Sequence, residues 1–120
     1  MKLLLSFCVV FSLFAVALTL RRIEFDRHYN AALVAWMRRD WAGAVRESYL
    51  ATDEGVFRSG VLHMRGVAQL NLGNYALAST AFRSALKLSP NAWYAHEGLG
   101  TACLRSGQNA DALCHYEVAL

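Results

Sequence analysis

The chain has few of the residues that interrupt helices and none of the common motifs that carry chemistry. Its only proline is Pro90, and neither glycine nor proline occurs between Lys2 and Trp41, so long helices are expected. The three cysteines include no C-x-x-C pair, and one lies in an apolar run, which excludes a disulfide framework. No Gly-rich phosphate loop, nucleophile elbow or paired-carboxylate motif is present, and we expect no enzymatic activity.

The charged residues argue against a nucleic-acid partner. The 120 residues carry a formal net charge of +3, and their 12 Lys and Arg are accompanied by 9 Asp and Glu. The basic residues are scattered along the chain, whereas a surface that follows a phosphate backbone needs them clustered on one face. The sequence therefore predicts no nucleic-acid binding.

Hydrophobic residues make up 56% of the chain and are concentrated at its N-terminus. Residues 3–20 carry no charge. As a helix this segment would extend about 27 Å, which is close to the thickness of a bilayer hydrocarbon core. The segment predicts a single-pass membrane anchor, and because no helix breaker follows it, the anchor and the next helix are expected to form one rod.

A cleaved signal peptide is the alternative interpretation of this segment. Lys2, the apolar run and the small residues at 15–17 match the three parts of such a signal, whose cleavage would remove residues 1–17. Arg21 and Arg22 follow at once and favour a retained anchor. The positive charges on the two sides differ too little to orient the helix. We expect a bacterial inner-membrane location, and the side on which the rest of the chain lies stays open.

The remainder of the chain repeats itself at an interval of 34 residues. The matching pairs are Gly66 and Gly100, Gly73 and Gly107, Ala78 and Ala112, Phe82 and Tyr116, and Ala85 and Ala119. A weaker first copy, from Phe25 to Arg58, keeps Ala32, Ala44 and Ala51 at the corresponding positions. A repeat of this length is typical of stacked helical hairpins.

Each copy is suited to a helix of about 14 residues, a turn and a second, antiparallel helix. Small residues such as Gly66 and Ala78 allow the two helices to approach closely, and Phe82 is expected to fill the space toward the next helix. Glycine at position 73 favours a turn within the hairpin. Pro90 is expected to end the second helix, because proline has no amide hydrogen and disfavours helical geometry in the preceding residue.

This pattern resembles the tetratricopeptide repeat (TPR) family. With Ser59 and Trp93 as first positions, the agreement with the family signature is at Gly66, Ala78, Phe82, Ala85 and Pro90, and then at Leu99, Gly100, Ala112, Tyr116 and Ala119. The first copy is degenerate, with Ser48 where an aromatic residue is usual and Gly55-Val56 in place of the closing proline. The resemblance implies an all-α fold, in which an N-terminal transmembrane helix is followed by about three TPR hairpins in a short right-handed solenoid.

The resemblance also implies the boundaries of the parts. Residues 1–22 would form the anchor or signal peptide, 23–58 the degenerate first TPR, 59–92 the second, and 93–120 the third. The third copy stops without a capping helix. Because each hairpin leaves an apolar surface for its neighbour, we expect this end to be covered by a second copy of the chain, a partner subunit or a continuation.

In TPR proteins the first helix of each repeat lines a groove that accepts peptides or helices of other proteins. Carried over to this sequence, the groove consists of Tyr29, Leu33, Trp36, His63, Val67, Leu70, Asn71, Tyr94, Glu97, Thr101 and Arg105. Its aromatic residues suit binding hot spots, although Trp36 has the alternative of packing against the anchor or the second repeat. Tyr29 and Leu33 replace the Lys and Asn of chaperone-binding members, so a chaperone C-terminus is not the expected ligand.

Metal or thiol chemistry is weakly supported. His96 and Cys103 share a helix face, and Cys114-His115 lies on the helix expected to pack back against it, but no close ligand pair is present. His28 and His96 occupy the same repeat position, which favours a packing role. We expect no metal and no cofactor.

The sequence thus predicts a membrane-anchored TPR scaffold or adaptor that assembles or stabilises a membrane or envelope protein complex. The alternative is a permanent accessory subunit of such a complex, whose anchor packs beside other transmembrane helices. In that case the small residues of the anchor would make the close contacts; these are Ser6, Ser12, Ala15 and Ala17.

Overall fold

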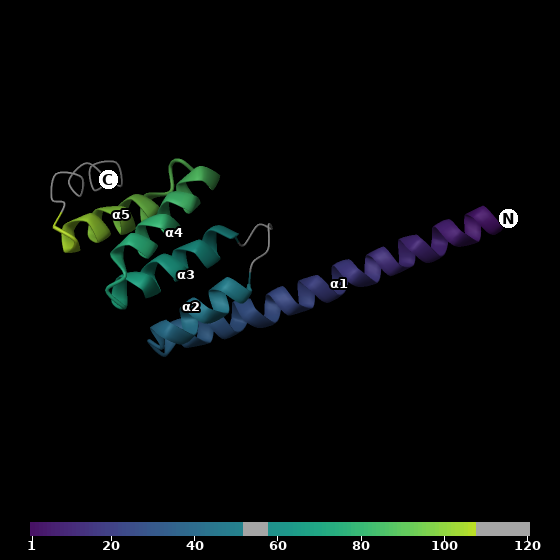
Figure 1. Ribbon diagram of the computed structural model, residues 1–120, viewed down its shortest axis with the longest axis horizontal. Helices are drawn as coiled ribbons and strands as arrows, with labels where there is room; N and C mark the ends of the chain where they lie inside the picture. The colour runs from purple at the N-terminus through teal and green to yellow at the C-terminus, as the bar shows by residue number, and fades with distance from the viewer. Residues whose placement is uncertain (52–57, 108–120) are drawn as a thin grey trace.

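The described part of the molecule is entirely helical (Figure 1). The computed structural model describes residues 1–51 and 58–107. Its helices are α1 (Lys2–Met37), α2 (Trp41–Leu50), α3 (Arg58–Asn71), α4 (Tyr75–Leu88) and α5 (Trp93–Arg105). These ranges contain no strand, which confirms the predicted all-α class. The expectations for Gly55-Val56, Ala112, Cys114-His115, Tyr116 and Ala119 lie outside the described residues.

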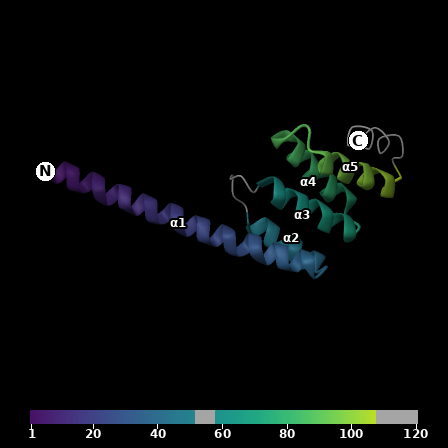
Figure 2. The same ribbon diagram turned by 180° about the vertical axis from the view of Figure 1, so that it is seen from behind.

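Helix α1 is one continuous helix of 36 residues. Its first half projects beyond the rest of the molecule, and its second half packs against α2 (Figures 1 and 2). Residues 1–24 are all exposed. By length and composition α1 is a candidate membrane span, and an N-terminal signal sequence would meet the same criterion. The continuity agrees with the absence of helix breakers from this part of the sequence.

The helices that follow form a stack of antiparallel hairpins. The second half of α1 pairs with α2, α3 pairs with α4, and α5 packs against α4 in turn, so that neighbours in sequence are neighbours in space (Figure 1). Helix α4 ends at Leu88, two residues before Pro90. Helix α4 therefore ends just before the proline, as was expected from the sequence.

The turns within the hairpins share one backbone feature. Arg39, Gly73 and Gly107 have φ angles of 59°, 80° and 89°, and successive members are 34 residues apart. Glycine adopts this left-handed conformation readily, whereas a side chain makes it unfavourable. In the first turn, the backbone amide of Gly43 donates to Asp40 Oδ1 at 3.0 Å and caps the start of α2. The first copy thus keeps the turn geometry without its glycine.

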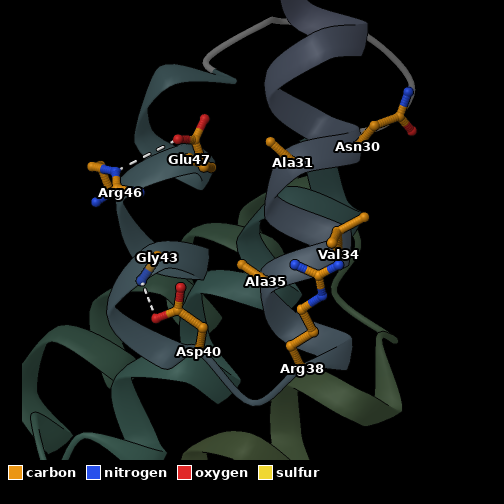
Figure 3. Close-up of a pocket in the computed structure, with 9 residues that line it drawn as sticks. All are labelled: Asn30, Ala31, Val34, Ala35, Arg38, Asp40, Gly43, Arg46 and Glu47. Atoms are coloured by element: carbon orange, nitrogen blue, oxygen red, sulfur yellow. Dashed lines mark hydrogen bonds and ion pairs between the residues drawn. The ribbon is translucent and has the colours of Figure 1, made fainter.

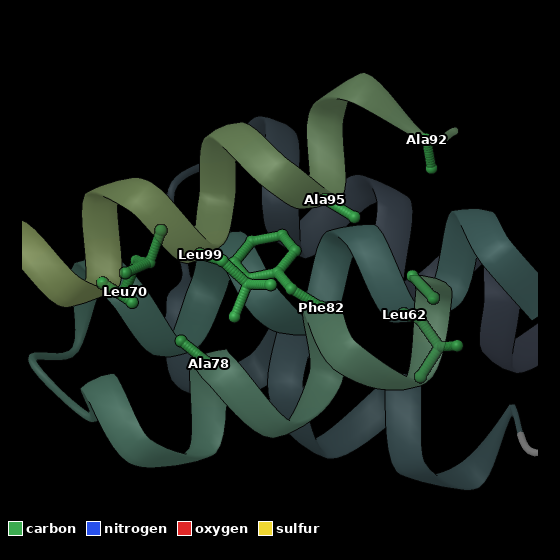
Figure 4. Close-up of a cluster of buried hydrophobic side chains, with 9 residues drawn as sticks. Leu62, Leu70, Ala78, Phe82, Ala92, Ala95 and Leu99 are labelled. Carbon is green, nitrogen blue, oxygen red and sulfur yellow. The ribbon is translucent and has the colours of Figure 1, made fainter. Parts of the chain in front are cut away.

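Phe82 is the centre of the core between the second hairpin and α5. Its fully buried ring projects from α4 among Ala78, Ala95 and Leu99 (Figure 4). A Cβ atom added to either Gly66 on α3 or Gly98 on α5 would overlap this ring. The two glycines therefore make room for one aromatic side chain. From the sequence, Gly66 was expected to let the helices of its hairpin approach closely and Phe82 to fill the space toward the next helix. The contribution of Gly98 was not predicted.

A polar cluster lies at the corresponding place between the first and second hairpins. Ser48, which stands in the repeat position of Phe82, is fully buried. Arg65 of α3 donates from Nη2 to the Ser48 carbonyl at 2.7 Å and from Nε to the Ser48 hydroxyl at 3.2 Å. Its guanidinium also lies 4.0 Å from the centre of the Tyr49 ring. Hydrogen bonds and a cation–π contact here replace the missing aromatic residue.

The two histidines at one repeat position make different contacts. His28 Nδ1 lies 2.8 Å from Glu47 Oε2 and links α1 to α2. This hydrogen bond, with a smaller contribution from Arg46, lowers the pKa of Glu47 below its ordinary value. His96 Nε2 instead lies 3.1 Å from the carbonyl of Pro90 and holds the α4–α5 loop against α5. Their equivalent positions do not lead to a shared role.

Candidate partner-binding site

A pocket of about 190 Å³ opens between α3, α4 and α5. Its lining residues are His63, Val67, Leu70, Phe82, Tyr94, Glu97, Gly98 and Thr101. Six of the eleven residues assigned to the groove from the sequence are therefore gathered around one cavity. Phe82 and Gly98 form part of the wall and were not assigned to it. The only sequence signal for them is the register that brings Phe82 opposite the following repeat.

His63 forms the aromatic side of the pocket. Its ring meets that of Tyr94 edge-on, with 4.8 Å between centroids, and lies 6.4 Å from the ring of Phe82. Burial lowers the pKa of His63 below its ordinary value of 6.5, and the negative charge of Glu97 partly opposes this shift. The imidazole is therefore largely neutral at pH 7. Its Nδ1 atom is buried and has no hydrogen-bond partner in the described part of the chain.

Glu97 places a negative charge on this otherwise apolar pocket. It is exposed on α5, and within residues 1–51 and 58–107 its carboxylate forms no ion pair. Its backbone carbonyl accepts a hydrogen bond from the Thr101 hydroxyl at 2.9 Å, so this turn of α5 is held in place on the pocket side. The pocket thus combines apolar walls, an unpaired buried nitrogen and a carboxylate, which is the composition of a small recognition site.

The comparisons with known proteins agree with this architecture. The tetratricopeptide repeat family matches residues 63–120. Residues 63–120 therefore belong to the tetratricopeptide repeat family. Similar solved structures include "MamA MSR-1 C2", with a TM-score of 0.74 and 24% identity over 79% of this chain and 55% of that one. A MamA mutant has a TM-score of 0.73 and 24% identity over 79% of this chain and 69% of its own.

A further MamA structure, "MamA AMB-1 P212121", has a TM-score of 0.70 and 25% identity over 77% of this chain and 50% of that one. The TPR chain therefore spans about half to two thirds of the length of these MamA structures, and the likeness shows a shared fold. No curated protein matches the chain. TPR hairpins typically serve as protein-interaction modules, so the fold supports protein partners in general.

The other five residues assigned to the TPR groove are not gathered around the pocket. Tyr29 is half-buried and stacks on Phe25, with 5.8 Å between ring centroids. Leu33 is exposed, and the half-buried Trp36 has a buried Nε1 atom without a hydrogen-bond partner among the described residues. Asn71 and Arg105 are both exposed toward the ends of their helices. The degenerate first repeat therefore contributes no lining residue to the pocket.

A second, wider groove of about 400 Å³ lies between α1 and α2 (Figure 3). Figure 3 views it with the rest of the stack behind, so it opens on the outer side of the first hairpin. Its lining residues are Asn30, Ala31, Val34, Ala35, Arg38, Asp40, Gly43, Arg46 and Glu47. None of them was assigned to the partner groove. The smaller pocket is the stronger candidate, because it carries both the assigned residues and an unsatisfied polar atom.

The residues considered for metal binding are differently engaged. His96 contacts Pro90, and Cys103 is a buried free thiol. Across residues 1–51 and 58–107, no group of three or more His, Cys, Asp or Glu side chains has the arrangement of a metal site. The histidine and cysteine of α5 therefore have packing roles where the structure describes them.

Proposed function

We propose that this protein is a membrane-anchored TPR scaffold that holds a segment of another protein in the pocket between α3 and α5. Helix α1 keeps the repeats close to the membrane, and the bound segment belongs to a protein of a membrane or envelope complex that is being assembled or stabilised. The observation that carries the proposal is the convergence of six groove residues from two successive repeats on one cavity. The protein acts by binding and carries out no reaction.

Two buried polar atoms support a bound partner. Nδ1 of His63 and Nε1 of Trp36 have no hydrogen-bond partner in the described part of the molecule, although both belong to the expected groove. Buried polar groups are nearly always hydrogen-bonded, and an unsatisfied one is costly. A partner in the pocket that forms a hydrogen bond with His63 Nδ1 would remove this cost there. The half-buried ring of Tyr94 adds apolar contact area beside the first of these atoms.

Exposure supports the proposed anchor. The apolar residues of the first half of α1 are at least half exposed, including Leu3, Phe7 and Phe11, and none packs on the repeats. Such a surface is stable in hydrocarbon and unfavourable in water. Ser12 and Thr19 donate to backbone carbonyls of their own helix, which satisfies their hydroxyls without water. Alkaline extraction and the mass of the mature protein would distinguish a retained anchor from a cleaved signal.

A permanent accessory subunit is the second candidate. Its anchor would pack beside other transmembrane helices, and the repeats would cover part of the complex. Purification in mild detergent separates the two, because a subunit has partners in fixed stoichiometry and an adaptor has substoichiometric, exchangeable ones. Self-association through the third repeat stays a prediction that sedimentation in detergent would test.

The pocket is tested by removing its aromatic side chains. We expect the variant His63→Ala/Tyr94→Ala to keep its helical circular dichroism and to lose partners that cross-link to the wild-type protein in its native membrane. Leu77→Ala is the control, because Leu77 is exposed on α4 and lines neither this pocket nor the groove between α1 and α2. Unchanged cross-linking of the double variant would show that partners bind elsewhere, and the outer groove of Figure 3 would be the next surface to examine.

A further inference from the structure

One edge of the repeat stack faces the projecting half of α1. This near edge, as we call it, is formed where α2 and α4 end and α3 and α5 begin (Figure 1). Its exposed residues include Leu50, Arg58, Lys87, Leu88 and Trp93, and Ser89, Pro90 and Asn91 of the α4–α5 loop are exposed there too. The opposite, far edge contains the turns within the hairpins. The two edges therefore lie at different distances from the apolar half of α1.

Contacts with α1 indicate how far the near edge lies from the end of the uncharged segment. The uncharged segment ends at Leu20, and Phe25 follows five residues later, about 7.5 Å further along the helix. Phe25 packs in one cluster with Ala51, just after α2, and with Val61, in the first turn of α3. The headgroup layer on one side of a bilayer is about 5–8 Å thick. If Leu20 marks the hydrocarbon boundary, this cluster lies at the outer surface of the headgroups.

The first residues of α3 lie closer to the apolar half of α1 than this cluster does. Helix α3 runs in the same direction as α1, away from the projecting end (Figures 1 and 2). Arg58 precedes Val61 by three residues, or about 4.5 Å of helix, which places it within the headgroup layer. A guanidinium at this depth is close to lipid phosphates.

Core contacts bring the α4–α5 loop to a similar level. Leu62, next to Val61 on α3, and Ala92, which precedes α5, lie at the same end of the buried cluster, opposite Leu70 (Figure 4), and Ala85 of α4 belongs to this cluster too. Leu88 lies almost a full turn beyond Ala85 toward the same edge, and Trp93 begins α5 directly after Ala92. The hydrogen bond from His96 to Pro90 fixes this loop.

The two edges differ more in their distance from the apolar half of α1 than in the kinds of residues that they expose. Exposed apolar residues occur at both, since Met37 and Leu104 at the far edge are 70% and 52% exposed. At the near edge, Leu88 is 48% exposed and Trp93 is 61% exposed. Tryptophan is enriched where membranes meet water, because its ring is apolar and its indole nitrogen can hydrogen-bond.

We propose that the near edge rests on the headgroup layer of the membrane that α1 crosses, with Trp93 and Leu88 entering it. This inference rests on the proposed membrane anchor. Glu24 and Asp26 follow Arg21 and Arg22 in the sequence and offset their charge, and Arg58 and Lys87 are cations of the described near edge. The contact relies on the apolar side chains together with these two cations, and phosphatidylcholine supplies both the apolar layer and the phosphates that it needs.

The three tryptophans provide the experiment. Trp36, on α1, follows Leu20 by 16 residues, or about 24 Å of helix, and Trp41 begins α2 at the same far edge. The full-length variant Trp36→Phe/Trp41→Phe keeps only Trp93, and its partner variant Trp93→Phe keeps the two distant tryptophans. Both are reconstituted into phosphatidylcholine vesicles with a nitroxide on part of the headgroups. We expect most of the Trp93 emission to be quenched and shifted to shorter wavelength, with little quenching in the Trp93→Phe variant.

The possible results separate the inference from the anchor. If the protein floats with the vesicles and resists alkaline extraction, but Trp93 is quenched no more than Trp36 and Trp41, the inference is wrong and the anchor stands. If the protein does not float with the vesicles at all, the anchor is wrong and the inference fails with it. Circular dichroism of both variants confirms that the Trp→Phe changes leave the helices formed, and Trp93→Phe changes only an exposed residue.

Discussion

Two contacts occupy equivalent places in the repeat: one lies between the first and second hairpins, and the other between the second hairpin and α5. Different side chains fill their centres. In the second contact, Phe82 projects between two helices that carry Gly66 and Gly98. In the first, Ser48 takes the aromatic position, and the residues in register with the two glycines are Ala32 and Met64, both buried. The smaller side chain at position 48 is thus accompanied by larger side chains at the two positions where the second contact has glycines.

Polar interactions complete the first contact. A buried hydroxyl and carbonyl on α2 need hydrogen bonds, and Arg65 supplies one to each. Ser48 Oγ also donates to the Val45 carbonyl at 2.7 Å, so the hydroxyl both donates and accepts. Burial lowers the pKa of Arg65 below its usual value, but this group stays charged at any physiological pH. In the first contact, hydrogen bonds across the interface thus take the place of the missing aromatic side chain.

The largest effect is expected at the regular contact. Phe82→Ala removes a fully buried ring that two helices enclose and leaves a cavity lined by glycines, which have no side chains to fill it. We expect the free energy of unfolding to fall by about 3–5 kcal/mol. Urea unfolding in mild detergent, followed by circular dichroism, measures it. Leu77→Ala on the exposed side of the same helix is the control. An equal loss of unfolding free energy in both variants would show that Phe82 is not central to the core.

The regular part of the fold was predictable because its signals are local and recur. The hairpins, their turns and the place of Phe82 could be predicted from glycine at 73, proline at 90 and the small residues 34 positions apart. The role of Arg65 was not predictable, because it depends on the absence of an aromatic residue from a different helix. Gly98 was missed for a similar reason, since the residue 34 positions earlier is Met64 and no repeat marks the position.

The candidate pocket was predictable where the repeats are regular. Six of the eight residues assigned on α3 and α5 line one cavity, whereas Asn71 and Arg105, toward the ends of these helices, do not. The residues assigned on α1 do not reach this cavity. Tyr29 packs instead on Phe25 and on the cluster that joins α1 to α3, which lies between the first and second hairpins.

A smaller effect is expected from making the first contact regular. Ser48→Phe places an aromatic ring at a position whose partners in repeat register, Met64 and Ala32, are buried side chains and not glycines, and it removes the hydroxyl that Arg65 contacts. Overpacking of this kind costs about 1–3 kcal/mol of unfolding free energy. Adding Met64→Gly opens the space that Gly98 leaves for Phe82 and should recover part of the loss, although glycine within a helix itself costs about 1 kcal/mol.

A double-mutant cycle measures this compensation. The two changes at 48 and 64 should together destabilise the protein less than the sum of their separate effects, because each corrects the volume error of the other. Strict additivity would mean that the two side chains do not share a space, and the proposed exchange of volume across the interface would be wrong.

The smallest effect is expected at the turns, where the two hairpins differ in one residue. Arg39 has the left-handed conformation that Gly73 and Gly107 adopt at the same repeat position. Arg39→Gly removes the clash between Cβ and the backbone but adds freedom to the unfolded chain, so we expect a net gain of about 0.5–1 kcal/mol in unfolding free energy. The reverse change, Gly73→Ala, is the matched control. A Cβ atom at Gly73 would have no atom within 4 Å, so a loss of about 1 kcal/mol there reports backbone conformation alone. If Arg39→Gly instead destabilises the protein while Gly73→Ala behaves as expected, the arginine side chain contributes more to the first turn than its backbone costs, and the first hairpin would have a second polar compensation beside that of Arg65.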